Sequence, residues 1–384
     1  MGNCFQDSAD QSACDTADTG SNCTFFPRQR ICLVCGAAAD KAVNDSRNAY
    51  REAESDQPRG KILQQLLRSG DELGIQQAAF VFLCKSGNGG RGAMTIRDAV
   101  ALARKELVET SLEDAEFEAR QLAAFCLGKR RLYTFEFADE MPGDALKKLQ
   151  SCIMRRKNHE PLQYIIGEWA FMGLPFTVNE NVLIPRADTE TLAEAAEKII
   201  AERRNTTAPV KFLLDVCTGS GCIGISVAKR TGVPALLCDI SPEAVSVAEK
   251  NIQLNGVGEL CMCRQGDLFE AALPFAKERA SGFDIITINP PYICTDVIHS
   301  LQPEVLREPM IALDGGADGL EFYRRIRKGY SCLLNPGGVL LLETGFDQGA
   351  AVSELFANDG AVSVLSDICG NDRVVVVEKR LNRG

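Results

Sequence analysis

Residues 211–224 (KFLLDVCTGSGCIG) combine an apolar run, a glycine-rich turn and the start of a helical pattern. Gly219 and Gly221 carry no Cβ and can bring backbone N–H groups close to a ligand. The N-terminus of a following helix favours electronegative groups. Two later strand patterns are followed by Asp239 and Asp267, which suit a ribose diol and an adenine amino group. The pattern predicts a nucleoside site.

Two classes of ligand compete for this turn. Gly219, Gly221 and Gly224 fit the G-x-G-x-x-G spacing of a dinucleotide fold, and Asp239 stands 20 residues after Gly219. However, Asp215 ends the first strand, where it would face a pyrophosphate. A carboxylate there suits a cationic ligand, such as the amino-acid moiety and sulfonium of S-adenosylmethionine. We therefore favour this methyl donor, while a turn that only packs the helix on the strand remains the third alternative.

A further apolar run, 283–288, leads directly into Asn289-Pro290-Pro291-Tyr292. The prolines stiffen the chain and leave carbonyl groups able to accept hydrogen bonds. An amide or exocyclic amino nitrogen is a poor nucleophile because its lone pair is delocalised. The Asn289 side-chain oxygen and the Pro290 carbonyl could hold both N–H groups of such a nitrogen and turn its lone pair toward a methyl group. Tyr292 would stack beside the planar acceptor, and a turn that only ends the strand is the alternative.

These motifs resemble a known family. Asn-Pro-Pro-Tyr after a methyl-donor fold is typical of amino-methyltransferases that act on adenine, cytosine or glutamine amide nitrogen. Four more segments resemble the protein-(glutamine-N5) methyltransferases of peptide chain release factors, namely 160–167 (EPLQYIIG), 183–190 (LIPRADTE), 341–343 (LLE) and 370–373 (GNDR). The resemblance runs from about Met94 to Arg380.

The resemblance implies methyl transfer from S-adenosylmethionine to the side-chain amide nitrogen (N5) of the glutamine in the Gly-Gly-Gln loop of release factors. No metal is expected. The expected catalytic residues are Asn289, Pro290 and Tyr292. The residues expected to bind the donor are Asp215, Thr218, Gly219, Ser220, Gly221, Asp239, Ile240, Asp267, Leu268 and Asn289. The residues expected to bind the protein substrate are Asn289, Pro290, Pro291, Tyr292 and Arg186.

Two other functions compete with this interpretation. An adenine-N6 nucleic-acid methyltransferase must bind the phosphate groups of its substrate, usually with a basic recognition domain. The formal net charge of −10 argues against one, so no high-affinity contact with nucleic acid is expected. A non-catalytic donor-binding protein would not need the intact Asn-Pro-Pro-Tyr motif.

The region that carries these motifs alternates strand and helix patterns. The expected strands are 211–216, 235–239, 260–264, 283–288, 338–343, 362–366 and 373–378, and the expected helices are 190–203, 222–230, 242–255 and 319–333. Such alternation predicts an α/β, doubly wound sheet with ligands at the carboxyl ends of its strands. With the resemblance, this becomes a Rossmann-like, seven-stranded class I methyltransferase domain over residues 185–384.

A small helical domain, 94–167, and a hairpin linker, 168–184, are expected before it. Thr95 and Asp98 have the spacing of a capping box. Ser111 is expected to cap a second helix that Gly128 ends, and a third helix is expected near 143–156. The helical domain would recognise the substrate, and Pro185 would start a helix with Arg186 in its first turn.

Residues 1–93 lie outside the resemblance and form an unassigned extension. Cys32 and Cys35 have the spacing of a metal knuckle, but a second such pair is missing and the first histidine is His159. We expect an accessory tail rather than a zinc site. The polar, acidic start and the lack of a long apolar run predict no membrane span, and sixteen cysteines fit a reducing cytoplasm. The preferred release factor and the oligomeric state have no signature in the sequence.

Overall fold

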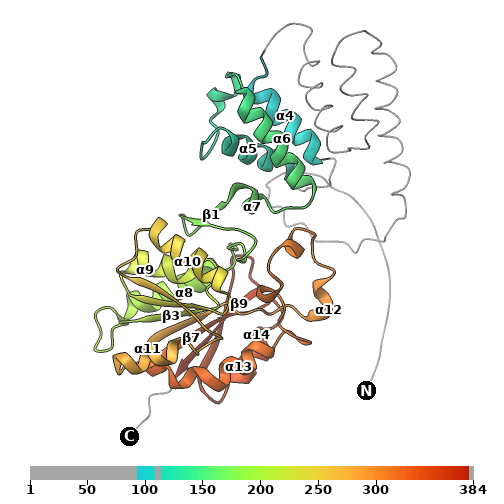
Figure 1. Ribbon diagram of the computed structural model, residues 1–384. Helices are drawn as coiled ribbons and strands as arrows, with labels where there is room; N and C mark the ends of the chain where they lie inside the picture. The colour runs from blue at the N-terminus through green and yellow to red at the C-terminus, as the bar shows by residue number, and fades with distance from the viewer. Residues whose placement is uncertain (1–92, 109–113, 380–384) are drawn as a thin grey trace, which may run out of the picture. The chain divides into compact units, whose positions relative to one another are not determined.

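The computed structural model describes residues 93–108 and 114–379. Its first elements, cyan to green in Figure 1, are helices: α4 (Ile96–Val108), α5 (Ala115–Cys126), the 3-10 helix η1 (Thr134–Ala138), α6 (Gly143–Lys157) and the short α7 (Leu162–Ile166). They share one apolar cluster that includes Ile96, Leu122 and Leu149. Helices this short are stable because they bury their apolar faces against each other.

Local signals set the ends of these helices. The Asp98 N–H donates to the Thr95 hydroxyl at 3.2 Å, and the Thr95 N–H donates to the Asp98 carboxylate at 3.4 Å, so the expected capping box forms. Asp114 is the N-cap of α5 and accepts a backbone N–H of the first turn at 3.1 Å. Ser111, the expected cap, lies outside the described residues. Gly128 follows α5 with φ +67°, the left-handed conformation that commonly follows a helix.

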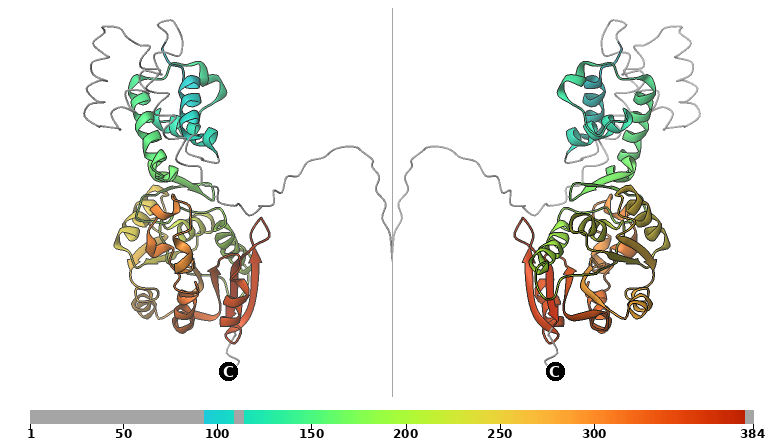
Figure 2. Two further views of the ribbon diagram at one scale, coloured as in Figure 1. Left: turned by 90° about the vertical axis from the view of Figure 1, so that its right-hand side faces the viewer. Right: turned by 90° about the vertical axis from the view of Figure 1, so that its left-hand side faces the viewer.

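The centre of the second part is a seven-stranded sheet with the order β5-β4-β3-β6-β7-β9-β8. Its strands are β3 (Leu213–Val216), β4 (Ala235–Asp239), β5 (Cys261–Gln265), β6 (Phe283–Ile288), β7 (Leu334–Glu343), β8 (Gly360–Ser366) and β9 (Asp372–Lys379). The first five run parallel, whereas β9 is antiparallel to β7 and to β8 and forms the red hairpin in Figure 2. The strand order reverses between β3 and β6, and ligands of open α/β sheets bind at such a switch point.

Helices cover both faces of this sheet (Figure 1). One face carries α8 (Glu190–Arg203), α9 (Cys222–Thr231) and α10 (Pro242–Leu254), and the other carries α11 (Ala272–Arg279), α13 (Glu321–Gly329) and α14 (Gly349–Phe356). Successive strand residues alternate between the two cores, with Leu213 and Leu341 in the first and Leu214 and Leu342 in the second. Both faces are buried, which is why the central strands are almost uniformly apolar.

The structure corrects several expected elements. Each expected strand is present, but Pro185 does not start a helix, because Thr189 is the N-cap of α8 and residues 183–186 are extended or irregular. A buried carboxylate, Glu308, accepts the Ile184 N–H at 3.0 Å and pairs with Arg186, which holds this segment out of the helix. The helix expected over 319–333 becomes α13 followed by a 3-10 turn. The sequence did not predict α11, α14 or the short α12 (Thr295–Ile298).

The hairpin expected at 168–184 is present as β1 (Glu168–Phe171) and β2 (Leu174–Thr177), paired antiparallel. Among the helices of the described residues, none combines the length and the apolar character needed to cross a bilayer.

Candidate active site

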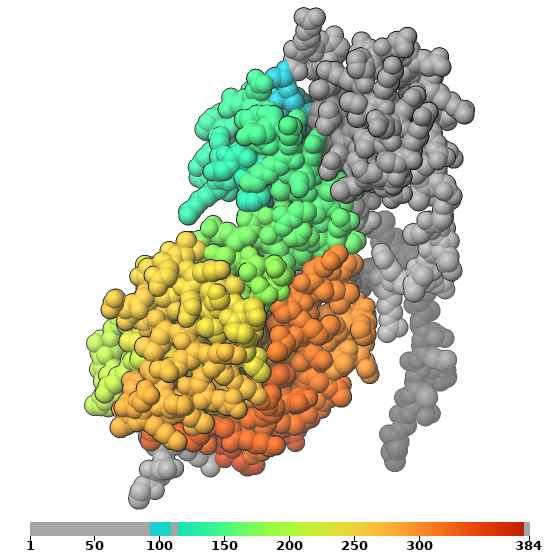
Figure 3. Space-filling view, in the orientation of Figure 1, coloured from blue at the N-terminus to red at the C-terminus, as the bar shows by residue number. Residues whose placement is uncertain are grey.

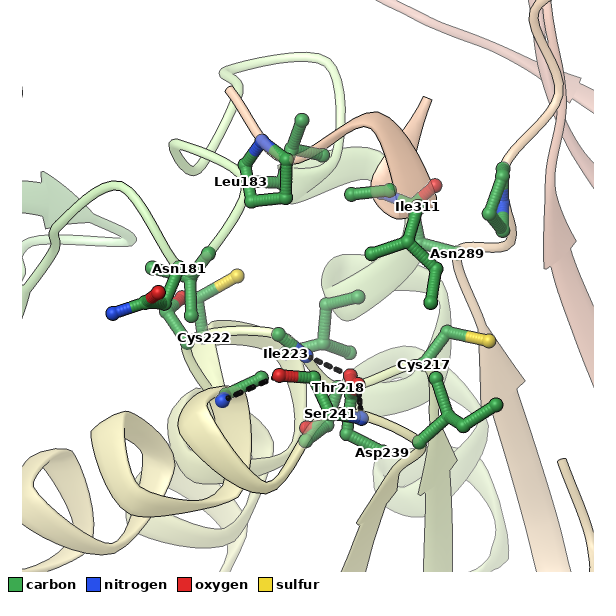
Figure 4. A pocket seen from close by; sticks show the side chains of 18 of the residues that line it. Asn181, Leu183, Cys217, Thr218, Cys222, Ile223, Asp239, Ser241, Asn289 and Ile311 are labelled. Atoms are coloured by element: carbon green, nitrogen blue, oxygen red, sulfur yellow. Dashed lines mark hydrogen bonds between the residues drawn. The ribbon is translucent and has the colours of Figure 1, made fainter. Parts of the chain in front are cut away.

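A pocket lies at the carboxyl ends of the central parallel strands. Asn289 and Ile311 lie on one side of it and Asn181 and Leu183 on the other, with the turn after β3 between them (Figure 4). The lining residues are Asn181, Val182, Leu183, Pro185, Arg186, Thr189, Cys217, Thr218, Gly219, Ser220, Cys222, Ile223, Asp239, Ile240, Ser241, Ala244, Gly266, Asp267, Leu268, Asn289, Pro291, Pro309, Ile311, Ala312, Phe322 and Arg325. The glycine turn and Asn289, which lie far apart in the sequence, therefore share one cavity.

The glycines of the turn have different roles. Gly219 lines the pocket with φ +54°, and a Cβ built on it meets no atom of the described chain within 4 Å, so it would project into open space. Gly221 also has a positive φ, +82°, but its Cβ would lie 2.7 Å from Ile225 Cδ1. At Gly224 a Cβ would lie 3.0 Å from Leu237 Cγ. Gly219 therefore leaves room for a ligand, whereas Gly221 and Gly224 allow α9 to pack closely against β3 and β4.

Asp215 stabilises the glycine turn through hydrogen bonds on its buried side. It is fully buried and is not among the residues that line the pocket. Its Oδ2 accepts from the Thr218 hydroxyl at 2.5 Å and from the Gly224 N–H at 3.1 Å, and its Oδ1 accepts from the Thr287 hydroxyl at 2.8 Å. Burial raises the pKa of Asp215 to about 6, although these hydrogen bonds oppose the rise. Direct contact between Asp215 and a ligand remains a prediction.

Asp239 connects the end of β4 to the same turn. Its Oδ2 accepts the Gly219 N–H at 2.8 Å, and its Oδ1 accepts the Ser241 N–H at 3.0 Å. Burial raises the pKa of this carboxyl, while the backbone hydrogen bonds oppose the rise. Each oxygen of a carboxylate has a second lone pair. Asp239 also lines the pocket, so it is positioned to accept further hydrogen bonds from hydroxyl groups.

Asp267 has a partner that the sequence did not reveal. Its Oδ2 forms an ion pair with Arg325 of α13 at 2.5 Å. Phe322, one helical turn before Arg325, also lines the pocket. The spacing of these two residues in an expected helix was the one available signal, because positions i and i+3 share a helix face.

The acceptor motif, Asn289-Pro290-Pro291-Tyr292, is divided between the pocket and the core. Asn289 and Pro291 line the pocket, whereas Pro290 and Tyr292 do not. The Tyr292 carbonyl accepts from Gln348 Nε2 at 2.9 Å, which connects the motif to the residue before α14. Burial raises the pKa of the Tyr292 hydroxyl. In the described ranges no backbone donor bonds to the Pro290 carbonyl, but Pro290 is buried and does not line the pocket, so its contact with an acceptor remains a prediction.

Most of the expected donor residues come together here. Eight of the ten line the pocket, and the exceptions are Asp215 and Gly221, which support the turn. Arg186, expected on the substrate side, also lines it and pairs with Glu308. Asn181, Val182 and the segment 309–312, which contains a 3-10 helix, were missed, because nothing in their composition indicates a binding site. The segment 309–312 lies at the surface of the sheet domain, orange in Figure 3, where Ile311 is 54% exposed.

The described part of the chain contains no group of three or more His, Cys, Asp or Glu side chains that could hold a metal. The candidate pair Cys32 and Cys35 lies outside it.

Comparisons with known proteins agree with this arrangement. Residues 98–167 match the family described as PrmC N-terminal domain, and residues 186–315 match the one described as Conserved hypothetical protein 95. Among solved structures, a methyltransferase from Pyrococcus furiosus is 16% identical, with 55% of this chain and 92% of that chain covered at a TM-score of 0.38, which is too low to carry an argument.

The curated relatives are much closer. Release factor glutamine methyltransferase of Clostridium acetobutylicum is 40% identical over 288 residues, covering 74% of this chain and 98% of that protein. Its counterpart in Geobacter sulfurreducens is 38% identical over 286 residues, covering 73% of this chain and 95% of that protein. Because identity at this level extends over nearly the whole of these relatives, the chain belongs to the family of release factor glutamine methyltransferases.

Proposed function

We propose that this protein transfers a methyl group from S-adenosylmethionine to the side-chain amide nitrogen (N5) of the glutamine in the Gly-Gly-Gln loop of peptide chain release factors. One observation carries the proposal beyond family membership. Asn289, from the acceptor motif, lines the same pocket as Gly219, Asp239 and Asp267, from the strand ends expected to hold the donor.

The residues of the pocket fit this donor. The open space beside Gly219 accepts a group that a Cβ would displace. The Asp239 carboxylate is suited to the ribose hydroxyls, and Asp267 with Phe322 is suited to the adenine. The carboxylates of this region favour a cationic ligand over a pyrophosphate. When bound, S-adenosylmethionine would supply an electrophilic methyl group on its sulfonium. Thr218, Ser220, Ile240 and Leu268 complete the lining.

Asn289 and Pro290 would hold the acceptor amide. The Asn289 side-chain oxygen and the Pro290 carbonyl accept its two N–H groups, which orients the nitrogen lone pair toward the donor. With the donor bound, this nitrogen would form a bond to the methyl carbon as the carbon–sulfur bond breaks, and it would lose one proton afterwards. Pro291 and Tyr292 would shape the slot on either side, and Arg186 borders it.

We further propose a division of labour along the chain. Residues 94–167 would recognise the protein substrate, and residues 185–384 would hold the donor. Residues 168–184 would link these two domains. The ten described cysteines are all free thiols, which is consistent with an enzyme that meets release factors in the cytoplasm.

Mass spectrometry of a purified release factor, incubated with the full chain and S-adenosylmethionine, tests the proposal. We expect the mass of one methyl group to appear on the loop glutamine, and to be absent with the Asn289→Ala variant. A nucleic acid offered in place of the release factor should remain unmodified. An unmodified release factor, or a methyl group on a different residue, would reject the proposed function.

A further inference from the structure

Thr189 occupies the N-cap position of α8 but does not cap the helix. A threonine at this position normally accepts a backbone N–H of the first helical turn through its hydroxyl. Within the described residues, the Thr189 side chain makes no such bond. The side chain is 2% exposed and lines the pocket, and Asn289 Nδ2 donates to its Oγ1 at 3.5 Å. The hydroxyl is therefore directed to the acceptor motif.

Glu343 is the second partner of this hydroxyl. It is the last residue of β7, is 1% exposed, and lies close enough to the Thr189 side chain for that hydroxyl to lower the pKa of its carboxyl group. Its Oε2 has no hydrogen-bond partner among the described residues. A carboxylate buried in this way costs free energy, so its presence calls for a reason. Burial raises the pKa of Glu343 to about 7, while the Thr189 hydroxyl and the nearby Arg373 oppose the rise.

The single proton of the Thr189 hydroxyl determines which way the Asn289 amide faces. An ionised Glu343 can only accept, so the hydroxyl must donate to it and can then only accept from Asn289. The Asn289 NH₂ group is thereby turned toward Thr189, and its oxygen is left for the pocket. If the amide turned over, its NH₂ group would face the N–H groups of the substrate and repel them.

We propose that Glu343, acting through Thr189, is a positioning residue that keeps the side-chain oxygen of Asn289 directed at the acceptor nitrogen. This inference rests on the proposed function for its catalytic consequence. A protonated Glu343 can instead donate to Thr189, which frees the hydroxyl to donate to the Asn289 oxygen. The aligned state therefore requires an ionised Glu343, and methyl transfer should increase as the pH rises through about 7.

Other ionisable groups around Glu343 also act on it. They come from the segment before α8, from α9, from the residues after β6, from α13 and from β9, and they are Arg186, Asp188, Cys222, Tyr292, Tyr323 and Arg373. A pH profile of the wild type alone would combine their effects, so the profile has to be compared with that of a variant that lacks only the Glu343 charge.

The experiment uses the full chain, an intact release factor and four variants. Glu343→Gln can donate to Thr189, and Thr189→Val removes the hydroxyl, so each should lower kcat by about tenfold to a hundredfold. The dissociation constant of the donor should stay within about twofold of the wild-type value, since neither side chain is assigned to the donor. Thr189→Ser keeps the hydroxyl and should recover most of kcat. Thr344→Val is the matched control, because the Thr344 hydroxyl is buried and unpartnered in the described chain.

The pH profile and an NMR signal separate this role from a merely structural one. The rise of kcat through about pH 7 should be absent in Glu343→Gln. In protein labelled with ¹⁵N-asparagine, the Asn289 side-chain NH₂ signal, identified by its loss in Asn289→Ala, should shift over the same pH range in the wild type only. This signal needs no methyl transfer, so it tests the positioning role even if the release factor is not a substrate. Wild-type kcat in Glu343→Gln or Thr189→Val, or an NH₂ signal that does not move with pH, would overturn the inference.

Discussion

Asp239 supports the fold of the glycine turn, because its two oxygens accept backbone N–H groups at 2.8 and 3.0 Å, and we propose that it also binds the donor. Asp239→Ala should weaken the binding of S-adenosylmethionine, or of its demethylated product, by ~1–3 kcal/mol, the usual value of hydrogen bonds to a charged group. Isothermal titration calorimetry measures this change. Glu249→Ala, which removes an exposed acid from α10, is the control for net charge. An unchanged affinity in Asp239→Ala would remove the assignment.

We propose that Asn289 acts on the acceptor rather than on the fold of the donor site, so the effects of its substitution on the two substrates should separate. Asn289→Ala should abolish turnover while the donor still binds, because it removes stabilisation that is specific to the transition state. Asn289→Asp keeps an acceptor oxygen but adds a charge, so it should retain more activity than Ala and less than the wild type. Steady-state kinetics with an intact release factor, together with calorimetry of donor binding, give both quantities. A near-normal kcat in Asn289→Ala would contradict the mechanism.

At the scale of elements, the turn between β3 and α9 contains two glycines that substitution should distinguish. Alanine at either position adopts a positive φ, +54° at 219 and +82° at 221, which costs about 1–2 kcal/mol. At 221 the new Cβ also meets Ile225 Cδ1 at 2.7 Å, and overpacking adds about 1–3 kcal/mol. Gly221→Ala should therefore lose more stability, whereas Gly219→Ala should lose more donor affinity. Thermal unfolding and calorimetry on both variants check the ranking, and the reverse order would disprove it.

The buried end of β3 should give the stability of the protein a characteristic pH dependence. The pKa of Asp215 is raised from 3.8 to about 6, so between these pH values the folded chain holds a proton that the unfolded chain has released. The free energy of unfolding should therefore fall as the pH rises through this range, by on the order of 3 kcal/mol. Glu343, with its pKa near 7, contributes a fall of the same sign.

Asp215→Asn isolates the first contribution. Its amide oxygen can still accept from Thr218 and Gly224, while its NH₂ group donates to Thr287, so the turn should survive. The thermal midpoint of the variant should depend less on pH between about 4 and 6 than that of the wild type, with the Glu343 contribution left in both. Equal pH dependence in the two proteins would show that Asp215 is not the titrating group.

Much of the site could be predicted because its residues follow strands directly. Asp239 ends β4 and Asn289 directly follows β6, and parallel strands bring their carboxyl ends to one edge of the sheet, so the sequence alone predicts that these residues lie at the same edge. The positions of Arg325 and Ile311, and the contact of Thr189 with Glu343 at the end of β7, could not be predicted in this way. They depend on how helices and loops pack on the sheet, and no local sequence pattern indicates that packing.

At the scale of the whole molecule, the described residues of the helical part do not line the pocket. The helical part does carry exposed aromatic side chains. Phe135 is 78% exposed and stacks on Tyr133 with 5.6 Å between ring centroids, and the Arg131 guanidinium lies 4.5 Å from the centre of the Tyr133 ring. Aromatic and arginine side chains are enriched in protein interfaces. This cluster of three residues is suited to bind a protein substrate rather than the donor.

An intact release factor should accordingly be a better substrate than a short peptide that contains the Gly-Gly-Gln loop. The peptide reaches Asn289 but offers no surface to the cluster of Arg131, Tyr133 and Phe135, so it lacks the remote binding energy that helps to orient the reacting group. We expect kcat/KM for the folded protein to be higher by on the order of a hundredfold. Phe135→Ala should reduce kcat/KM by about tenfold for the release factor, as the loss of an important aromatic contact with a protein partner does, and leave the peptide reaction unchanged. Equal values for protein and peptide, or an equal loss with both in Phe135→Ala, would show that the helical part does not recognise the substrate.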